Sequence, residues 1–393
     1  MTTPLKRVAH VNRSVLPETT PADYAFRYVD IGAVTDGRVD IPDADVVFAS
    51  APSRARRLAP AGATVVSTVR TYLRAVARVP DVQHPLVFST GFAVLEARPG
   101  MHPGFLHYAC RSSRFIEEVV ARSTGVGYPA ITAGDLANIK VYVPPVEQQQ
   151  RVAALLEDHL KALDEVLMAH ETLLTLMDER IEARIGEYIV PALAGEAGHP
   201  MLPIKRLLRK VSRTTPVGAP VVTAFRDGQV IARSLRRAEG YTESWTDSAV
   251  MQGVEVGDVV VHGLDGFAGA VGTSESAGAC SPANHVCVPL DGGDTDFYGR
   301  MLRIFARSGY LSLYGGSARE RAVDFRNWAT FSRIPLPIVS AEAQQEIGES
   351  IRVARDLRVQ TRRLLELVVE KKQALVDAAI VDEAAGQREG GAA

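Results

Sequence analysis

The sequence predicts an α+β protein built as a tandem repeat of two β-rich halves, each followed by one long helix. Short segments recur 193 to 199 residues apart: Pro4–Val8 resembles Pro203–Leu207, and Lys140–Pro144 resembles Arg333–Pro337. Each copy then continues into a long polar segment with helical periodicity. This period is too long for a solenoid, whose repeats span about 20 to 50 residues. We therefore expect two equivalent globular domains related by a pseudo-two-fold axis.

The boundaries follow from prolines, glycines and changes in periodicity along the 393 residues. We expect a first globular domain, a first spacer helix, a linker, a second globular domain, a second spacer helix and a disordered tail. These segments occupy residues 1–145, 146–190, 191–200, 201–338, 339–381 and 382–393.

In the first half, β-branched and aromatic runs predict strands over Arg27–Ile31 and Ala63–Val69. Apolar residues at helical spacing predict one helix over Gly104–Arg122. The run Val143-Pro144-Pro145 ends the last strand, because consecutive prolines continue neither a strand nor a helix.

The two long helices are the clearest elements, because apolar residues repeat along them with heptad spacing. Their stripes most simply bury against each other as an antiparallel coiled coil. The predicted seam consists of Leu156, Leu160, Leu163, Leu167, Leu174, Met177, Ile181, Ile347, Ile351, Leu357, Leu364, Val368 and Leu375. His170 interrupts the first stripe and is interpreted as a polar register-setter, and Pro191 is expected to end that helix.

In the second half, Val254–Val261 predicts a strand and Phe297–Arg307 a helix. The glycine-rich run Gly263–Gly269 fits a tight β-turn better than a phosphate cradle, because isolated glycine patterns are weak signals.

Composition is that of a globular protein, with 46% hydrophobic and 23% charged residues. The sequence contains no apolar run long enough to span a bilayer and no signal-peptide pattern. Cys110, Cys280 and Cys287 are odd in number and lack CxxC spacing, so we expect reduced thiols in a cytoplasmic protein. The nine histidines form no metal-binding pattern.

Charge is divided unevenly along the chain, although the net value is only −2. Residues 1–140 hold 16 Lys and Arg against 12 Asp and Glu, and residues 200–338 hold 16 against 13. The helix at 147–189 holds 4 against 10, and residues 340–383 hold 7 against 9. Basic globular domains and acidic helices favour nucleic acid as a partner of the domains.

Candidate DNA contacts are arginines and one tyrosine that cluster in both globular domains, since the guanidinium fork suits phosphates and guanine edges. A codon bias toward arginine explains the abundance equally well, and for any single arginine a solvated surface role is at least as plausible. The candidates are Arg54, Arg56, Arg57, Arg70, Tyr72, Arg74, Arg226, Arg233, Arg236, Arg237, Arg319, Arg321 and Arg326.

Catalytic signatures are absent from the sequence. It contains no GxxxxGK or GxGxxG motif and no Asn/Asp-Pro-Pro-aromatic tetrapeptide of amino-methyltransferases. Glu370-Lys371 stands on a predicted coiled-coil helix without a paired carboxylate strand, so a nuclease site is not supported. These absences favour a binding protein without catalytic, cofactor or metal sites.

Together these features resemble the specificity subunit of type I restriction–modification systems over nearly the whole chain. The most specific part is the join between each domain and its helix: Ser123-Thr124-Gly125 through Val141–Pro145, and Gly316–Arg319 through Ile334–Pro337. Gly257-Asp258 and Ser281-Pro282-Ala283 are similar to the body of the family's target-recognition domains. The first domain departs from that pattern at Gly62-Ala63 and Ser89-Thr90, which puts its loop geometry in doubt.

The resemblance implies a non-catalytic subunit for DNA modification and phage defence, whose two domains each read half of an asymmetric DNA target. It implies that the helices act as a ruler and dock two methyltransferase subunits, with restriction/translocase subunits joining for cleavage. S-adenosylmethionine would belong to the methyltransferase. Two alternatives stay open: a specificity-like DNA-binding subunit of another phage-defence or modification system, and a non-catalytic coiled-coil adaptor without a role on DNA.

Overall fold

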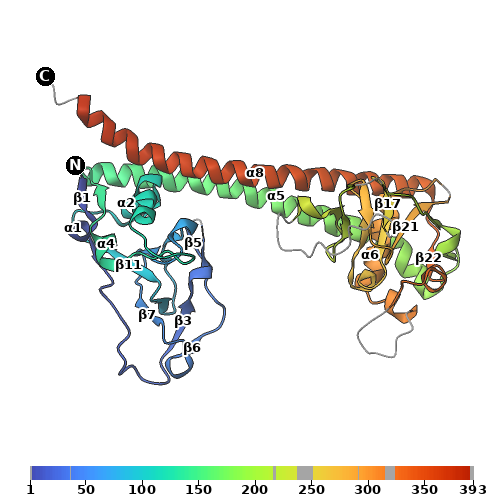
Figure 1. The fold of residues 1–393 in the computed structure, drawn as a ribbon, viewed down its shortest axis with the longest axis horizontal. Coiled ribbons are helices and arrows are strands. Elements are labelled where there is room, and N and C mark those ends of the chain that lie inside the picture. Colours follow the sequence, from blue (N-terminus) through green and yellow to red (C-terminus); the bar gives the residue numbers. More distant parts are fainter. Residues whose placement is uncertain are drawn as a thin grey trace. The chain divides into compact units, whose positions relative to one another are not determined.

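The computed structural model describes residues 2–35, 37–215, 218–236, 251–290, 292–314 and 324–389, with side chains up to Ile380. The chain divides into two compact units. Unit 1 is Met1–Met168 with Arg363–Ala393, and unit 2 is Ala169–Arg362. Each unit contains one β-rich domain, hereafter a head, and part of both long helices (Figure 1). Unit boundaries therefore run through the helices and not at the ends of the heads.

The first head is built on an antiparallel sheet of order β2-β11-β8-β9. Its strands are β2 (Ala9–Val11), β11 (Phe92–Ala97), β8 (Thr64–Ser67) and β9 (Val76–Arg78). A second sheet has the order β6-β3-β10-β7, with β3 parallel to β10. Its strands are β6 (Val46–Val47), β3 (Ala25–Val29), β10 (Leu86–Ser89) and β7 (Ala55–Leu58). The strands expected in this head correspond to β8 and β3.

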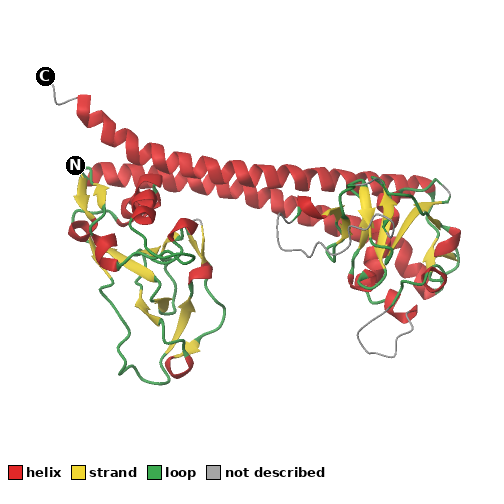
Figure 2. Cartoon of the chain, viewed as in Figure 1, coloured by secondary structure: helices red, strands yellow, loops and turns green. Residues whose placement is uncertain are grey.

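Helices of the first head cover the β2-β11-β8-β9 sheet (Figure 2). The single helix expected over Gly104–Arg122 is wrong, because the chain forms α2 (Pro103–Arg111) and α3 (Ser113–Ala121). Ser112 separates them with an extended ψ of 144°, and its hydroxyl accepts the backbone N–H of Phe115 as an N-cap. The short helices α1 (Leu5–Val8) and α4 (Ala133–Ala137) and the hairpin of β4 (Val34–Thr35) and β5 (Arg38–Val39) complete the head.

The second head repeats the first sheet strand for strand, in the order β14-β21-β18-β19. These are β14 (Leu208–Lys210), β21 (Asn284–Pro289), β18 (Val259–His262) and β19 (Val271–Thr273). Two antiparallel pairs accompany it: β15 (Val222–Ala224) forms a hairpin with β16 (Val230–Ala232), and β17 (Gln252–Val254) pairs with β20 (Gly278–Cys280). Helix α6 (Thr295–Arg307) packs on β19, and α7 (Trp328–Phe331) follows.

The strand expected over Val254–Val261 is instead two strands that belong to different pairs. Between them Asp258 accepts the backbone N–H of Glu255 and pairs with the guanidinium of Arg213 at 2.6 Å. This carboxylate fixes a turn that the apolar pattern does not reveal.

The repeated peptides of the sequence pair with each other inside each unit. In unit 1, β1 (Thr2–Pro4) lies antiparallel to β12 (Lys140–Tyr142). In unit 2, β13 (Met201–Pro203) lies antiparallel to β22 (Pro335–Pro337). Each repeat therefore begins and ends in a two-stranded pair at the entrance to its long helix.

The long helices are α5 (Val146–Ala194) and α8 (Ala341–Glu389), and they pack antiparallel, as predicted. Pro191 lies inside α5, so the expected end there is wrong. Pro191 lacks the N–H that would bond the carbonyl four residues earlier and its ring crowds that carbonyl, yet the helix continues for three more residues before it ends at Ala194. The backbone of α8 is helical to Glu389 where the sequence predicted disorder from Asp382, since the Glu, Ala, Gln and Arg residues of this segment have high helix propensity. Residues 390–393 lie outside the described part.

Each unit has its own principal core where the head meets the helices. In unit 1, buried residues of α2 and α3 pack with Leu156 and Leu160 of α5 and Val376 of α8. In unit 2, α6 packs with Ile181 of α5 and Ile351 of α8. Within the described residues, no helix combines the length and apolar character needed to cross a membrane.

Candidate nucleic-acid interface and helix joints

A buried glutamine joins the first head to its helix. Gln149 lies in the first turn of α5 and is fully buried. Its Oε1 accepts the backbone N–H of His102, the N-cap residue of α2, at 2.7 Å. Its Nε2 donates to the carbonyls of Gly100 at 3.1 Å and Pro144 at 2.8 Å. One side chain thus fixes the start of the head helix against the start of the long helix.

The same joint recurs in unit 2 with Gln344, which is 2% exposed. Its Oε1 accepts the backbone N–H of Asp294, the N-cap residue of α6, at 3.1 Å. Its Nε2 donates to the carbonyl of Val339 at 2.8 Å and lies 3.5 Å from the hydroxyl of Tyr298. The sequence Glu147-Gln148-Gln149-Gln150 recurs as Glu342-Ala343-Gln344-Gln345, but it gives no sign that the third residue of each run is buried.

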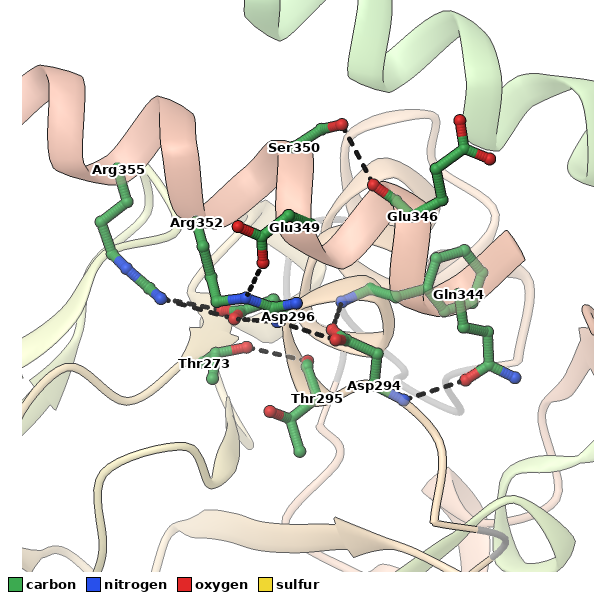
Figure 3. A network of polar contacts seen from close by, with 11 residues as sticks. Thr273, Asp294, Thr295, Asp296, Gln344, Glu346, Glu349, Ser350, Arg352 and Arg355 are labelled. Carbon is green, nitrogen blue, oxygen red and sulfur yellow. Dashed lines mark hydrogen bonds and ion pairs between the residues drawn. The ribbon is translucent and has the colours of Figure 1, made fainter. Parts of the chain in front are cut away.

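Unit 2 strengthens its joint with a network of carboxylates and guanidinium groups (Figure 3). Asp294 accepts from Arg352 at 2.7 Å, and Asp296 accepts from Arg355 at 2.8 Å and from Arg352 at 3.2 Å. The hydrogen bond to Asp294 is the main cause that raises the pKa of Arg352. Both aspartates are almost wholly buried, so this network orients α6 on α8.

A second network crosses from α6 to both long helices. Asp178 of α5 accepts from Arg300 of α6 at 2.6 Å and forms a shorter contact with Arg358 of α8. Burial opposes ionisation of Asp178, but the hydrogen bonds from Arg358 and Arg300 outweigh it and lower its pKa. Arg184 pairs with Glu346 farther along the same helices.

The thirteen predicted seam residues are all buried or half-buried. Within unit 1, Lys372 of α8 also pairs with Asp164 of α5. Within unit 2, the Nδ1 atom of half-buried His170 lies 3.4 Å from the hydroxyl of Thr361. The interpretation of His170 as a register-setter stays a prediction.

In each unit a hairpin glycine leaves room for the side chain of an arginine on a helix of the head. Gly37 has φ +79°, and a Cβ atom there would lie 2.6 Å from a guanidinium nitrogen of Arg111 on α2. Gly228 has φ +87°, and a Cβ atom there would collide with the side chain of Arg303 on α6. This equivalence is invisible in the sequence, where the two hairpins share no motif.

Three predicted DNA candidates lie on one exposed turn of the first head. The 3₁₀ turn Thr71–Leu73 presents Tyr72, and Arg70 and Arg74 flank it. Both arginines adopt the left-handed conformation, with φ of 48° and 56°. The guanidinium of Arg70 lies 4.7 Å above the ring of Tyr128, and Arg74 donates to the hydroxyl of Ser113 at 3.1 Å.

The other candidates of the first head are held by the protein itself. Arg54 donates to Tyr28 and pairs with Asp30 at 2.7 Å, and its bond to Tyr28 is the main cause of its raised pKa. Arg56 packs over the ring of Phe48 at 5.0 Å. Arg57 is half-buried, and burial lowers its pKa.

Most described candidates of the second head are paired with carboxylates. Arg226 pairs with Asp265 at 2.8 Å, Arg236 with Asp227 at 2.6 Å, and Arg326 with Asp324 at 2.6 Å. Arg233 donates to Thr223. Arg237, Arg319 and Arg321 lie outside the described residues. An exposed ion pair contributes only about 0–1 kcal/mol, so these arginines can exchange a carboxylate for a phosphate at small cost. Arg70 and Arg74 need no such exchange, which makes their turn the stronger candidate.

Reactive and metal-binding chemistry has little support in the described part of the chain. It holds no group of three His, Cys, Asp or Glu side chains that could bind a metal ion. Burial raises the pKa of Cys280 and of Cys287 to about 12, so neither forms a thiolate at neutral pH.

The chain is similar to known proteins in sequence over part of its first repeat and in fold over nearly its whole length. Residues 33–169 match the family of the type I restriction modification DNA specificity domain. A solved structure described for complex assembly and conformational transition of the type I R-M system is 20% identical, with 97% of each chain covered and a TM-score of 0.63. The type I restriction-modification S subunit from M. genitalium is 12% identical, covering 97% of this chain and 96% of that chain at a TM-score of 0.51.

The HsdS subunit from Thermoanaerobacter tengcongensis is 19% identical over 97% of this chain and 96% of that chain, with a TM-score of 0.47. No curated protein matches. The family match lies in the first repeat, and the strand order and the glutamine joint recur in the second. Residues 33–169 thus match the model of the type I restriction modification DNA specificity domain, and the fold of the chain is similar to that of a solved type I R-M structure.

Proposed function

We propose that the two heads each read one half of a bipartite, asymmetric DNA sequence and so set the target of a type I restriction–modification complex. The observation that carries this proposal is a contrast between the heads. Their four-stranded sheets and glutamine joints are equivalent, whereas their exposed arginine surfaces differ. Equivalent scaffolds with different surfaces suit two readers of different sequences.

Electrostatics supports duplex DNA as the ligand of the heads. The segments 1–140 and 200–338 carry net charges of +4 and +3 from the residue counts above. Contacts to phosphates supply affinity without sequence information, and contacts to base edges supply specificity. A specificity subunit is a recognition subunit and not the catalyst, so the proposal assigns no catalytic residue to this chain.

A head exchange tests the proposal directly. Residues 1–145 are replaced by the first head of a specificity subunit with a different target, and modified bases are mapped in host DNA by sequencing. We expect one half of the recognised sequence to change and the other half to stay. Modification that is unaffected by the exchange would refute the assignment of half-sites to heads.

We further propose that the long helices dock the methyltransferase subunits of the complex. Exposed apolar residues follow the heptad register of α5 away from its buried seam, and they include Val166 in unit 1 and Leu173 and Leu176 in unit 2. Leu176 is 56% exposed. A second apolar stripe on a coiled-coil helix favours a further helix as its partner, and the acidic flanks of α5 favour a basic one.

Introducing negative charge on this stripe tests the docking surface. The variant Leu173→Asp/Leu176→Asp should lose copurification with the methyltransferase, because carboxylates cannot be buried in an apolar helix interface. Thr175→Asp, an exposed position between them, serves as the matched control and should copurify normally. Retention of the methyltransferase by the double variant would contradict the proposal.

The remaining parts of the complex follow from this arrangement. We propose that the helices set the number of unread base pairs between the half-sites, that S-adenosylmethionine is bound by the methyltransferase, and that restriction/translocase subunits join for cleavage. A cytoplasmic location is expected, because chain, partners and DNA must share one compartment.

A further inference from the structure

The loop that follows α3 lies beside the strained turn of the first head. Thr124 and Ala130 exchange backbone hydrogen bonds of 2.9 Å and close the loop. The backbone N–H of Arg70 donates to the carbonyl of Pro129 at 2.8 Å, and Ile131 donates to Thr68 at 2.9 Å. The loop and the turn therefore form one surface, which we call the 70/126 surface. It consists of Arg70, Tyr72, Leu73, Arg74, Val126 and Tyr128.

Val126 is the most exposed apolar residue of this surface, with a relative exposure of 106%. Gly125 and Gly127 flank it with φ of 113° and 88°, a conformation that favours glycine. A Cβ atom on Gly125 would lie 3.2 Å from the carbonyl oxygen of Tyr128. The glycines thus specify a tight loop that presents a valine to solvent. An exposed valine contributes no burial to the fold, so stability does not account for it.

The rest of the surface is also unusual for a solvated face. Tyr128 is 68% exposed, and about half of Tyr72 and of Leu73 is exposed. Arg70 and Arg74 hold a left-handed backbone, which is unfavourable for a residue other than glycine. Such strain concentrates at functional sites. The six side chains combine two cations, two aromatic rings and two apolar groups with no carboxylate among them.

This composition fits the base edges of duplex DNA better than phosphates alone. Phosphates need donors and cations but gain nothing from apolar groups. In the major groove, thymine presents a C5-methyl group that apolar side chains contact, and arginine suits neighbouring guanine. We propose that Val126 is a specificity-determining residue that contacts the C5-methyl group of a thymine in the half-site read by the first head. The inference rests on the proposed function.

A double-mutant cycle tests this contact by combining the removal of methyl groups from Val126 with the removal of a thymine methyl group from the DNA. The assembled complex of the full chain with its methyltransferase is titrated with its target duplex and with duplexes in which single thymines of the first half-site are replaced by deoxyuridine. Wild type should lose about four-fold in affinity at one thymine, the effect of one buried methyl group. Val126→Ala should lose a similar factor or more on the thymine duplex and show no further loss with deoxyuridine at that position. Val82→Ala, an exposed valine elsewhere in unit 1, is the matched control and should behave as wild type.

The outcomes separate the inference from the function on which it rests. Insensitivity of wild type to deoxyuridine at every thymine, or Val126→Ala with unchanged affinity and unchanged deoxyuridine sensitivity, would overturn the contact while sequence-specific binding persists. Equal affinity of wild type for target and scrambled duplexes would overturn the proposed function itself. Unchanged melting of Val126→Ala confirms that an exposed side chain was removed without loss of folding.

Discussion

Leucine has nearly the same volume as glutamine, so Gln149→Leu fills the same space but removes three hydrogen bonds. The variant leaves the backbone N–H of His102 without its acceptor and the carbonyls of Gly100 and Pro144 without their donor. Because Gln149 is fully buried, water cannot replace these bonds without opening the joint. Gln150 is exposed in the next position, so Gln150→Leu provides a control with the same chemistry.

The magnitude follows from the number of groups left without partners. A buried polar group without a partner costs about 1–3 kcal/mol, and the buried leucine offsets part of the sum. We therefore expect unit 1 to lose about 3 kcal/mol. Gln344→Leu should cost unit 2 less, because one of its three contacts is 3.5 Å long and weak.

Hydrogen exchange of the amides of α2 measures this loss within one unit, where a single melting temperature for a two-unit chain would not. A loss of about 3 kcal/mol corresponds to exchange that is roughly 100-fold faster. Gln149→Leu should accelerate α2 and leave α6 unchanged, and Gln344→Leu should do the reverse. Equal exchange in Gln149→Leu and Gln150→Leu would refute the view that the glutamine holds the joint.

Further predictions concern unit 2. Asp178→Ala should destabilise the unit by about 2–4 kcal/mol because it removes the 2.6 Å partner of the buried Arg300 and leaves only Glu182 at 3.5 Å. Glu179→Ala at an exposed neighbour should be neutral in denaturant unfolding. The pKa of Asp178 in the folded protein lies below its ordinary 3.8, so the ionised carboxylate stabilises the fold at pH values above 3.8. This stabilisation disappears as the pH falls through the folded-state pKa. Acid unfolding of wild type should show the loss, and acid unfolding of Asp178→Ala should not. Gly228→Ala should lower the free energy of unfolding by about 2 kcal/mol and Gly257→Ala by about 1 kcal/mol. Both glycines have positive φ, but only a Cβ atom at Gly228 meets the side chain of Arg303. Equal losses of stability in melting experiments would show that Arg303 moves aside without cost.

The repeat and the long helices could be predicted from sequence because their signals are local. Heptad spacing extends over many turns, and the prolines of Val143-Pro144-Pro145 stop a strand wherever they occur. The predicted elements were wrong where the side chain of a single polar residue accepts a backbone N–H and interrupts the helix or strand. Ser112 divides a continuous apolar pattern into two helices, and Asp258 divides an apparent strand. Side-chain capping competes with periodicity and leaves little trace in composition.

The candidate site was less accessible to sequence. Arginine clusters alone do not separate Arg54, which pairs with Asp30, from Arg70, which stacks on an exposed tyrosine. Partner carboxylates come from distant parts of the chain, and only folding brings them within hydrogen-bond distance. The loop around Val126 carries no charge, and the exposure of Val126 becomes visible only in the structure.

The sequence by itself determined that this protein consists of two heads on two antiparallel helices, because duplication and periodicity are properties of the chain. The tertiary structure alone decided that Gln149 and Gln344 hold equivalent joints and that Gly37 and Gly228 seat equivalent arginines. Those equivalences depend on contacts between residues far apart in sequence, where burial selects geometry and leaves the surrounding residues free to differ.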